Sequence, residues 1–312
     1  MKIKPCTVLT LALALCLLCA CTGRGEQGRA GLVDLADPIG GSSIVTAEDL
    51  LTFFARGEGD VAVLAADISL ENAMLCVTQA RNNITIEGNG FTLSGAGDCV
   101  LRLEDGCSVT LNNLTLHGGA DAIGFLGDAK LGGRGATILG GGNGIRGTKE
   151  IVILTGSDIA VTANKGIGVQ AGSITLQSGA ALSAQGPLGG ISAEEDDISL
   201  EAGSRLSAYT DMNYNALRCA GTLIMKEGSA CTVENKGEYH GAELGALSVE
   251  GTVTIQAKGG AKGAGLFLFE QLEDITVLGA CTPKPRFESG KGSIAFAGSK
   301  GAQSAQGIAA GQ

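Results

Sequence analysis

A pair of apolar residues separated by a single residue recurs along this chain at steps of 19 to 30 residues. Such alternation is the period of a β-strand, in which one side chain points inward and the next outward. The pairs are Leu101/Leu103, Ile123/Phe125, Ile167/Val169, Leu217/Cys219, Leu247/Val249 and Leu266/Leu268, with weaker copies at Ile145 and Ile191. The sequence therefore predicts a repeat of short strands.

A second series of pairs runs in parallel with the first. Its members are Ile84/Ile86, Val109/Leu111, Ile151/Ile153, Ile174/Leu176, Ile198/Leu200, Leu223/Met225, Val253/Ile255 and Ile275/Val277. A glycine follows four members, and a third pair follows each glycine: Gly156 then Ile159/Val161, Gly179 then Leu182/Ala184, Gly203 then Leu206/Ala208, Gly228 then Cys231/Val233. Because glycine supplies the positive φ that tight turns need, each repeat of about 22 to 25 residues is predicted to hold three strands separated by turns.

Other repeat folds fit the pattern poorly. Residues 80–282 show no 3.6-residue apolar stripe, and 51 glycines in 312 residues oppose stable helices. The Leu-x-x-Leu-x-Leu spacing of leucine-rich repeats is missing. A flat β-sandwich would not keep the two series of apolar pairs at a matching spacing along the chain. The remaining solution is an all-β solenoid in which each repeat forms one coil that pairs with the coils above and below.

The start of the repeat region carries a family resemblance. Thr46 precedes an apolar and acidic stretch typical of a short amphipathic helix, with Leu50, Leu51, Phe53 and Phe54 on its apolar face. The segments 61–70 (VAVLAADISL) and 82–95 (NNITIEGNGFTLSG) follow. Over about residues 45–280 the chain resembles the right-handed parallel β-helix proteins of the pectate-lyase-like superfamily. That resemblance implies a right-handed single-stranded parallel β-helix with a short N-terminal capping helix.

The N-terminus resembles a bacterial lipoprotein signal. Lys2 and Lys4 precede an apolar run, 7–18, which is too short for a stable membrane span and ends in Leu-Cys-Ala-Cys. The resemblance makes Cys21 the lipid-accepting residue, and the alternative is an ordinary secretory signal cleaved nearby. The expected location is therefore extracytoplasmic, with lipid anchoring to the bacterial cell membrane.

These features divide the chain into four expected parts. They are a signal peptide (1–20), a lipidated flexible spacer (21–43), the β-helix (44–282) and a closing segment with a loose tail (283–312), in which 293–297 is a predicted strand. The formal net charge of −10 repels nucleic acid and anionic lipid. We therefore expect no nucleic-acid partner, and membrane contact only through the lipid on Cys21.

Two stretches where the repeat lengthens form the candidate ligand site. They are 209–215 (YTDMNYN) and 234–244 (ENKGEYHGAEL), and they hold all three tyrosines of the chain. A tyrosine ring offers an apolar face and a hydroxyl, a combination suited to a sugar ring. The candidate ligand-binding residues are Tyr209, Asp211, Tyr214, Tyr239, His240 and Glu243. The alternative is that the two stretches only pack on each other.

No catalytic residue can be assigned. Resemblance to pectate lyases implies acidic Ca²⁺ ligands with a basic residue, and resemblance to the hydrolase branch implies three Asp with His and Arg or Lys, but neither set maps onto this chain. A charged group of Asp121, Asp128, Lys130, Arg134 and Arg146 suits either a lyase-like site or ordinary ion pairs. The acidic run 194–197 suits either weak Ca²⁺ binding or a solvated corner, and His117 a solvated turn. We expect no metal site and no cofactor other than this weak Ca²⁺ candidate.

Six cysteines lie beyond the lipobox: Cys76, Cys99, Cys107, Cys219, Cys231 and Cys281. Export permits disulfides between them, whereas the inward register of Cys219 and Cys231 favours free buried thiols. The function expected from the whole sequence is non-catalytic binding of a polysaccharide or another cell-envelope partner. The alternatives are a polysaccharide lyase or glycoside hydrolase, and a structural adhesin or stalk.

Overall fold

The computed structural model describes residues 42–56, 59–251 and 253–268, together with the strand segments 277–278, 286–289, 295–298 and 301–304. The predicted signal peptide, Cys21, most of the spacer and Cys281 lie outside the described residues. Contacts within the chain separate residues 1–37 from residues 38–312, and the described residues all belong to the second unit.

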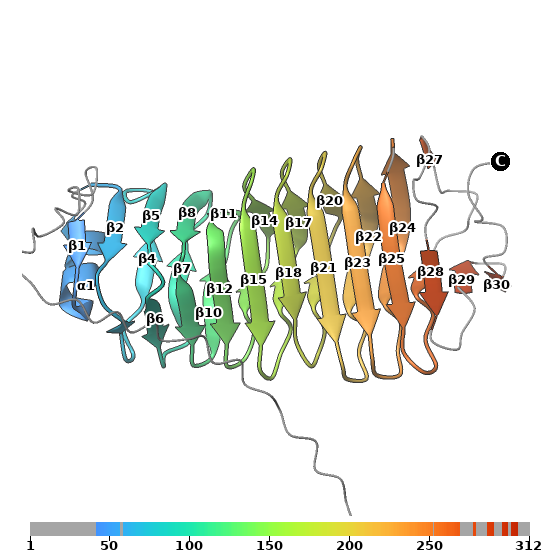
Figure 1. Cartoon of the computed structure of the whole chain (residues 1–312), viewed down its shortest axis with the longest axis horizontal. Coiled ribbons are helices and arrows are strands. Elements are labelled where there is room, and N and C mark those ends of the chain that lie inside the picture. The colour runs from blue at the N-terminus through green and yellow to red at the C-terminus, as the bar shows by residue number, and fades with distance from the viewer. Residues whose placement is uncertain are drawn as a thin grey trace, which may run out of the picture. The chain divides into compact units, whose positions relative to one another are not determined.

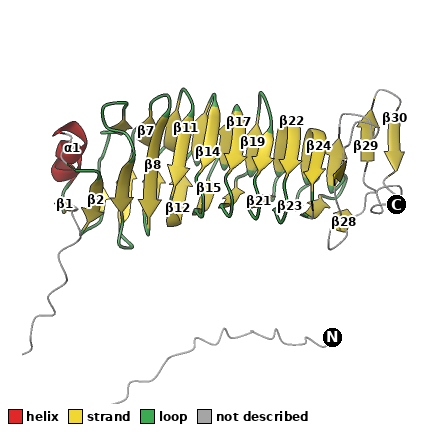
Figure 2. Cartoon of the chain, turned by 90° about the horizontal axis from the view of Figure 1, so that it is seen from above, coloured by secondary structure: helices red, strands yellow, loops and turns green. Residues whose placement is uncertain are grey.

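The described chain is a parallel β-solenoid of about nine turns, with coils of about 24 residues and very little helix (Figure 1). Each regular coil contributes one strand to each of three ladders. Figure 2 shows the stacked coils from a second side. Backbone hydrogen bonds therefore run from coil to coil, which is the pairing that the repeat predicts.

The strands of the first ladder are β4 (Leu75–Val77), β7 (Cys99–Leu103), β10 (Asp121–Phe125), β13 (Ile145–Gly147), β16 (Val169–Ala171), β19 (Ile191–Ala193), the first part of β22 (Leu217–Met225), the first part of β24 (Ala242–Glu250), β26 (Leu266–Leu268) and β29 (Ala295–Gly298). The strands of the second are β1 (Ser42–Ile44), β2 (Val61–Leu64), β5 (Ile84–Glu87), β8 (Cys107–Asn112), β11 (Ala129–Gly132), β14 (Glu150–Ile153), β17 (Ser173–Leu176), β20 (Ile198–Leu200), the second parts of β22 and β24, and β27 (Val277–Leu278). The strands of the third are β3 (Ile68–Ser69), β6 (Thr92–Gly95), β9 (Thr115–Gly118), β12 (Arg134–Gly140), β15 (Asp158–Ala163), β18 (Ala181–Gln185), β21 (Arg205–Thr210), β23 (Ala230–Asn235), β25 (Thr254–Gly259) and β28 (Arg286–Ser289).

The third ladder confirms the sequence register of the central coils. Its inward column runs through Ile159, Leu182, Leu206 and Cys231, which are partners in successive coils. The four glycines predicted to turn the chain before these strands have φ between 66° and 72°. This backbone region is strained for other residues, so the glycine spacing marks the corner of each coil.

The first ladder corrects two members of the predicted series. Ile145 pairs with Val169 rather than Ile167, so the inward pair of that coil is Val169/Ala171. Leu217 pairs with Ala242, and Leu247 belongs to the second ladder opposite Leu223. The predicted 30-residue step is therefore wrong, because a small alanine occupies the inward position that the leucine was assigned.

The second ladder also differs from its predicted series. Val109 pairs with Leu131, a position that the predicted series lacks, and Leu131 then pairs with Ile153. Ile255 lies opposite Cys231 in the third ladder. The prediction that Val253/Ile255 belongs to the second series is therefore wrong. The second-ladder pair before it is Leu247/Val249, which the sequence pattern places in the first series.

The core is a stack of aliphatic side chains, almost all of them less than a tenth exposed. Cys219 and Cys231 lie within it at 1% exposure each, as their register predicts. The five described cysteines, Cys76, Cys99, Cys107, Cys219 and Cys231, are all free thiols. Small sulfur-bearing side chains thus serve here as core packing.

The predicted capping helix is α1 (Ala47–Arg56). The Thr46 hydroxyl accepts a hydrogen bond from the Asp49 amide at 3.1 Å, and the Thr46 amide donates to the Asp49 carboxylate at 3.1 Å. This reciprocal pair caps the helix N-terminus. Leu50, Phe53 and Phe54 are buried in the first coils, and Arg81 holds α1 by donating to the Phe53 carbonyl oxygen at 3.2 Å.

The boundaries at both ends differ slightly from expectation. β1 already includes Ser42 and Ser43, which the sequence assigned to the spacer. Near the C-terminus, β29 overlaps the predicted strand 293–297 and pairs antiparallel with β30 (Gly301–Ser304), where a loose tail was expected. Among the described residues, no helix combines the length and apolar character that crossing a bilayer requires.

Candidate functional site

Two turns on consecutive coils contain most of the predicted ligand-binding residues. Residues 211–216 connect β21 to β22, and residues 236–241 connect β23 to β24. Because β21 pairs with β23 and β22 with β24, the two turns are neighbours along the solenoid. They are ordinary corners rather than the long insertions expected, since 209–210, 234–235 and 242–244 belong to strands.

A buried asparagine ties the two turns together. The Asn235 side chain is 1% exposed and donates to the carbonyl oxygens of Tyr214, at 2.6 Å, and His240, at 2.9 Å. Its Oδ1 accepts from the amide of Gly237 at 2.7 Å. A buried amide with these partners fixes the backbone on both sides of it.

A second amide continues this network toward the surface. Asn215 Oδ1 accepts from the amide of His240 at 3.1 Å, and its Nδ2 donates to Glu243 Oε2 at 2.7 Å. Glu243 also pairs with Arg218, with 3.6 Å between Arg218 Nε and Glu243 Oε1. Glu243 therefore supports the turn, and its role as a ligand contact stays a prediction.

His240 is likewise part of the scaffold. Its Nδ1 accepts a hydrogen bond from the amide of Ala264 at 2.9 Å, and its ring stacks on Phe267 with 4.5 Å between centroids. Burial lowers the pKa of His240 below its ordinary value of 6.5, although the charge of Glu243 opposes this shift. The neutral imidazole is thus the form that fits, because a protonated Nδ1 could not accept the amide hydrogen.

The predicted tyrosines divide into one covered ring and two exposed ones. Lys236 Nζ lies 5.1 Å from the centroid of the Tyr209 ring and covers it in a cation–π contact. Tyr214 is 51% exposed and Tyr239 is 52% exposed. Asp211 is exposed as well, and it makes no hydrogen bond or ion pair with the described part of the chain.

Further apolar side chains extend the exposed surface along the same row of corners. Met212 is 52% exposed beside Tyr214, and Leu188, in the turn between β18 and β19 one coil earlier, is 43% exposed. We name Leu188, Met212, Tyr214 and Tyr239 the aromatic ridge. It presents apolar surface from three consecutive coils, and the network above holds the backbone of the two turns that carry the tyrosines.

The other charged candidates do not assemble. Asp121 accepts from the amide and side chain of Asn143, at 2.9 Å and 3.0 Å, and pairs with Arg146 at 3.9 Å. Asp128 accepts from the backbone of Glu150 at 3.3 Å. No bond among described residues joins either acid to Lys130 or Arg134, so the five residues do not assemble into one site.

The acidic run is similarly dispersed among partners. Glu194 accepts from Gln170 at 2.7 Å, Glu195 pairs with Lys149 at 3.4 Å, and Asp197 accepts from the amide of Thr222 at 2.6 Å. No cluster of three metal-ligating side chains occurs within the described ranges. His117 is an exposed side chain on β9.

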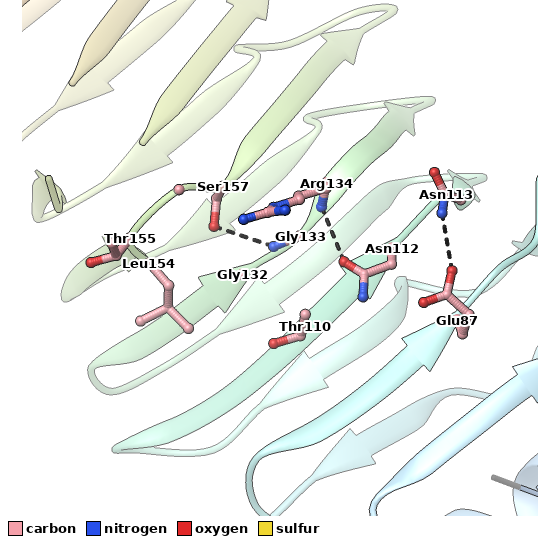
Figure 3. A pocket seen from close by; sticks show the side chains of 11 residues that line it. Glu87, Thr110, Asn112, Asn113, Gly132, Gly133, Arg134, Leu154, Thr155 and Ser157 are labelled. Carbon is pink, nitrogen blue, oxygen red and sulfur yellow. Dashed lines mark hydrogen bonds between the residues drawn. The ribbon is translucent and has the colours of Figure 1, made fainter. Parts of the chain in front are cut away.

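One hollow was missed by the sequence reasoning. A cavity of about 480 Å³ opens at the corner between the second and third ladders, over four coils (Figure 3). Its polar lining includes Glu87, Thr110, Asn112, Arg134 and Ser157. The sequence offers one indication of this cavity, because the stretch Gly132-Gly133-Arg134 follows one coil after the asparagines at 112–113. That the two stretches lie next to each other can be recognised only when the pairing of the coils is known.

Comparison with known proteins finds the fold and no family. No protein-family model matches the chain, and no curated protein matches it. A solved structure named "L. reuters 100-23 SRRP" is similar, with a TM-score of 0.50 and 13% sequence identity, over 83% of this chain and 96% of that one. At this identity the likeness supports the parallel β-solenoid alone.

Proposed function

We propose that this protein is a lipid-anchored cell-surface β-helix that binds a carbohydrate or another cell-envelope partner without transforming it. The observation that carries the proposal is the aromatic ridge, where Tyr214 and Tyr239 stand half exposed on consecutive coils. Large exposed apolar side chains gathered on one edge are typical of an interaction surface.

The chemistry of the ridge suits a sugar chain. Neither tyrosine hydroxyl bonds to another described residue, so each ring offers an apolar face together with a free polar group. The backbone beneath is held by Asn235 and Asn215, which reduces the conformational entropy lost on binding. The parts of the site are thus arranged before a ligand arrives.

The remaining parts of the proposal rest on the sequence. Cys21 in the lipobox carries the anchor, which places the solenoid outside the cytoplasm and makes the lipid its membrane contact. The pattern of segments 46–54, 61–70 and 82–95 supports right-handed winding and membership of the pectate-lyase-like superfamily. Binding at the ridge requires no cofactor or metal, and the acidic surface disfavours nucleic acid.

The test replaces both exposed rings. The Tyr214→Ala/Tyr239→Ala chain should lose retention on an array of plant, host and bacterial glycans while its circular dichroism and thermal midpoint stay unchanged. The matched control is Leu126→Ala, which removes a side chain 70% exposed at a different corner and should leave retention intact. Equal retention by the double variant and the parent would remove the ridge from consideration, and absence of any bound partner would favour a stalk.

The alternative of a polysaccharide lyase lacks an assembled acid–base group in the described structure. Asp121 is paired with Arg146 at the start of β10, whereas Lys130 lies on β11. The same glycan panel distinguishes this alternative, because a lyase would release unsaturated product with a rise in ultraviolet absorbance that Lys130→Ala abolishes.

A further inference from the structure

The cavity at the corner of the second and third ladders is bordered by two adjacent glycines. Gly132 ends β11 and Gly133 follows it, and Asn112 and Leu154 flank them from the coils on either side. A Cβ at Gly132 would lie 2.9 Å from Thr110 Oγ1 and 3.1 Å from Leu154 Cδ1. A Cβ at Gly133, where φ is +155°, would collide with the Leu111 carbonyl oxygen. Glycine is therefore required at Gly133, and at Gly132 a larger residue would displace Thr110 or Leu154 from the cavity wall.

Hydrogen bonds to backbone and side-chain groups fix the polar lining. Asn112 Oδ1 accepts from the amide of Arg134 at 3.1 Å, and Ser157 Oγ accepts from the amide of Gly133 at 3.2 Å. Asn113 Nδ2 donates to Glu87 Oε1 at 3.1 Å (Figure 3). These bonds hold the side chains that face the cavity in defined orientations.

Several groups at the cavity keep unused bonding capacity. The Asn112 Nδ2, the Thr110 hydroxyl and the Arg134 guanidinium make no hydrogen bond or ion pair to any described residue. Asp158, the ladder partner of Arg134, lies beyond ion-pair distance of it. Three other arginines, Arg81, Arg146 and Arg218, are paired with carboxylates. Arg134 thus brings an uncompensated guanidinium with five donors to a concave, polar surface.

We propose that this cavity is a second ligand site, which binds a hydroxylated ligand carrying an oxyanion through Arg134, Asn112 and Thr110. The guanidinium matches the paired oxygens of a carboxylate, sulfate or phosphate, and the amide and hydroxyl groups beside it match sugar hydroxyls. The volume of about 480 Å³ falls within the range of small-molecule sites. The site lies at a different corner, in earlier coils than the aromatic ridge, and is independent of it.

The test is calorimetric titration of the purified full chain with four probes. Glucuronate, glucose 6-sulfate and glucose 6-phosphate supply the three oxyanions on one sugar frame, and glucose is the uncharged reference. At least one anionic sugar should bind about tenfold or more tightly than glucose, and the strongest of the three identifies the oxyanion. Acetate and inorganic sulfate should bind more weakly than the corresponding sugars, because they lack the hydroxyls.

Two variants locate the binding. Arg134→Gln should weaken the best probe about tenfold or more, since it removes the charge and the paired donors. Asn112→Asp retains the acceptor for the Arg134 amide but replaces a donor by a negative charge, so it should weaken the anionic probes more than it weakens glucose.

The matched control is Arg205→Gln. Arg205 occupies the same column as Arg134 three coils further along, through Asp158 and Ala181, and is also exposed. Its replacement changes the net charge equally and should leave every affinity unchanged. The proposal is overturned if no anionic sugar binds better than glucose, or if Arg134→Gln binds as the parent or no more weakly than Arg205→Gln.

Discussion

Asn235 shows how much of the candidate site depends on one buried amide. Its three hydrogen bonds reach the backbone of Tyr214, Gly237 and His240. Asn235→Ala would leave two carbonyls and one amide unsatisfied, so we expect the free energy of unfolding to fall by about 3 kcal/mol in urea titrations. The exposed Asn213→Ala in the same turn should change it by less than about 0.5 kcal/mol. Equal losses in the two variants would show that Asn235 does not hold the turns.

The two inward cysteines make stability depend on alkaline pH. Burial raises the pKa of Cys219 and of Cys231 from 9.0 to about 12. The unfolded thiols ionise first, so the folded state holds more protons between these values, and its stability should fall as the pH rises from about 9 toward 12. In the Cys219→Ala/Cys231→Ala variant the free energy of unfolding should fall less steeply with pH than in the parent. The difference in slope should be up to about 1.4 kcal/mol per pH unit for each thiol. Denaturant titrations at pH 8, 10 and 11 measure the slopes, and identical slopes would contradict the assignment.

At the scale of the element, the N-terminal helix closes the first coils, and its cap is local. Thr46→Ala removes the hydroxyl that accepts the Asp49 amide, and should destabilise α1 by about 1 kcal/mol. Hydrogen exchange should quicken at residues 48–50 and stay constant in β15, far along the solenoid. Thr46→Ser keeps the acceptor and should exchange as the parent does. Faster exchange throughout the chain would mean that the helix supports more than its own end.

The strands were predictable where glycine and large aliphatic residues mark them. Gly156 and Gly179 identify a corner because few other residues adopt their φ, and the branched pairs that follow have the strand period. Ala242 could not be recognised as an inward strand residue, since its small side chain does not distinguish a buried position from an exposed one. The start of its strand was therefore included in the predicted stretch 234–244. The cavity at Arg134 depends on which residues four coils bring together, and one sequence segment does not contain that information.

At the scale of the whole molecule, the acidic surface and the proposed lipid anchor make opposite predictions about membranes. A net charge of −10 repels anionic lipid, so the chain itself should not associate with it. Expressed in a bacterium, the parent chain should sediment with membranes at physiological salt, whereas Cys21→Ser should remain in the soluble fraction. Cys6→Ser, which changes another N-terminal cysteine, should behave as the parent. Sedimentation of Cys21→Ser with membranes would contradict the lipid anchor.

The backbone sets the separation between Tyr214 and Tyr239, because their turns follow paired strands in adjacent coils. Neighbouring strands lie about 4.8 Å apart, and ladder hydrogen bonds resist any change in that distance. The spacing along the aromatic ridge is therefore a property of the backbone, and substitution of the ridge side chains does not alter it. A substitution can change which ligand group a ridge residue contacts, whereas a different spacing would require the insertion or deletion of a whole coil. A polymer whose repeat length matches this spacing would place an equivalent unit at each ridge position. A polymer with a different repeat length would lose this alignment within a few units.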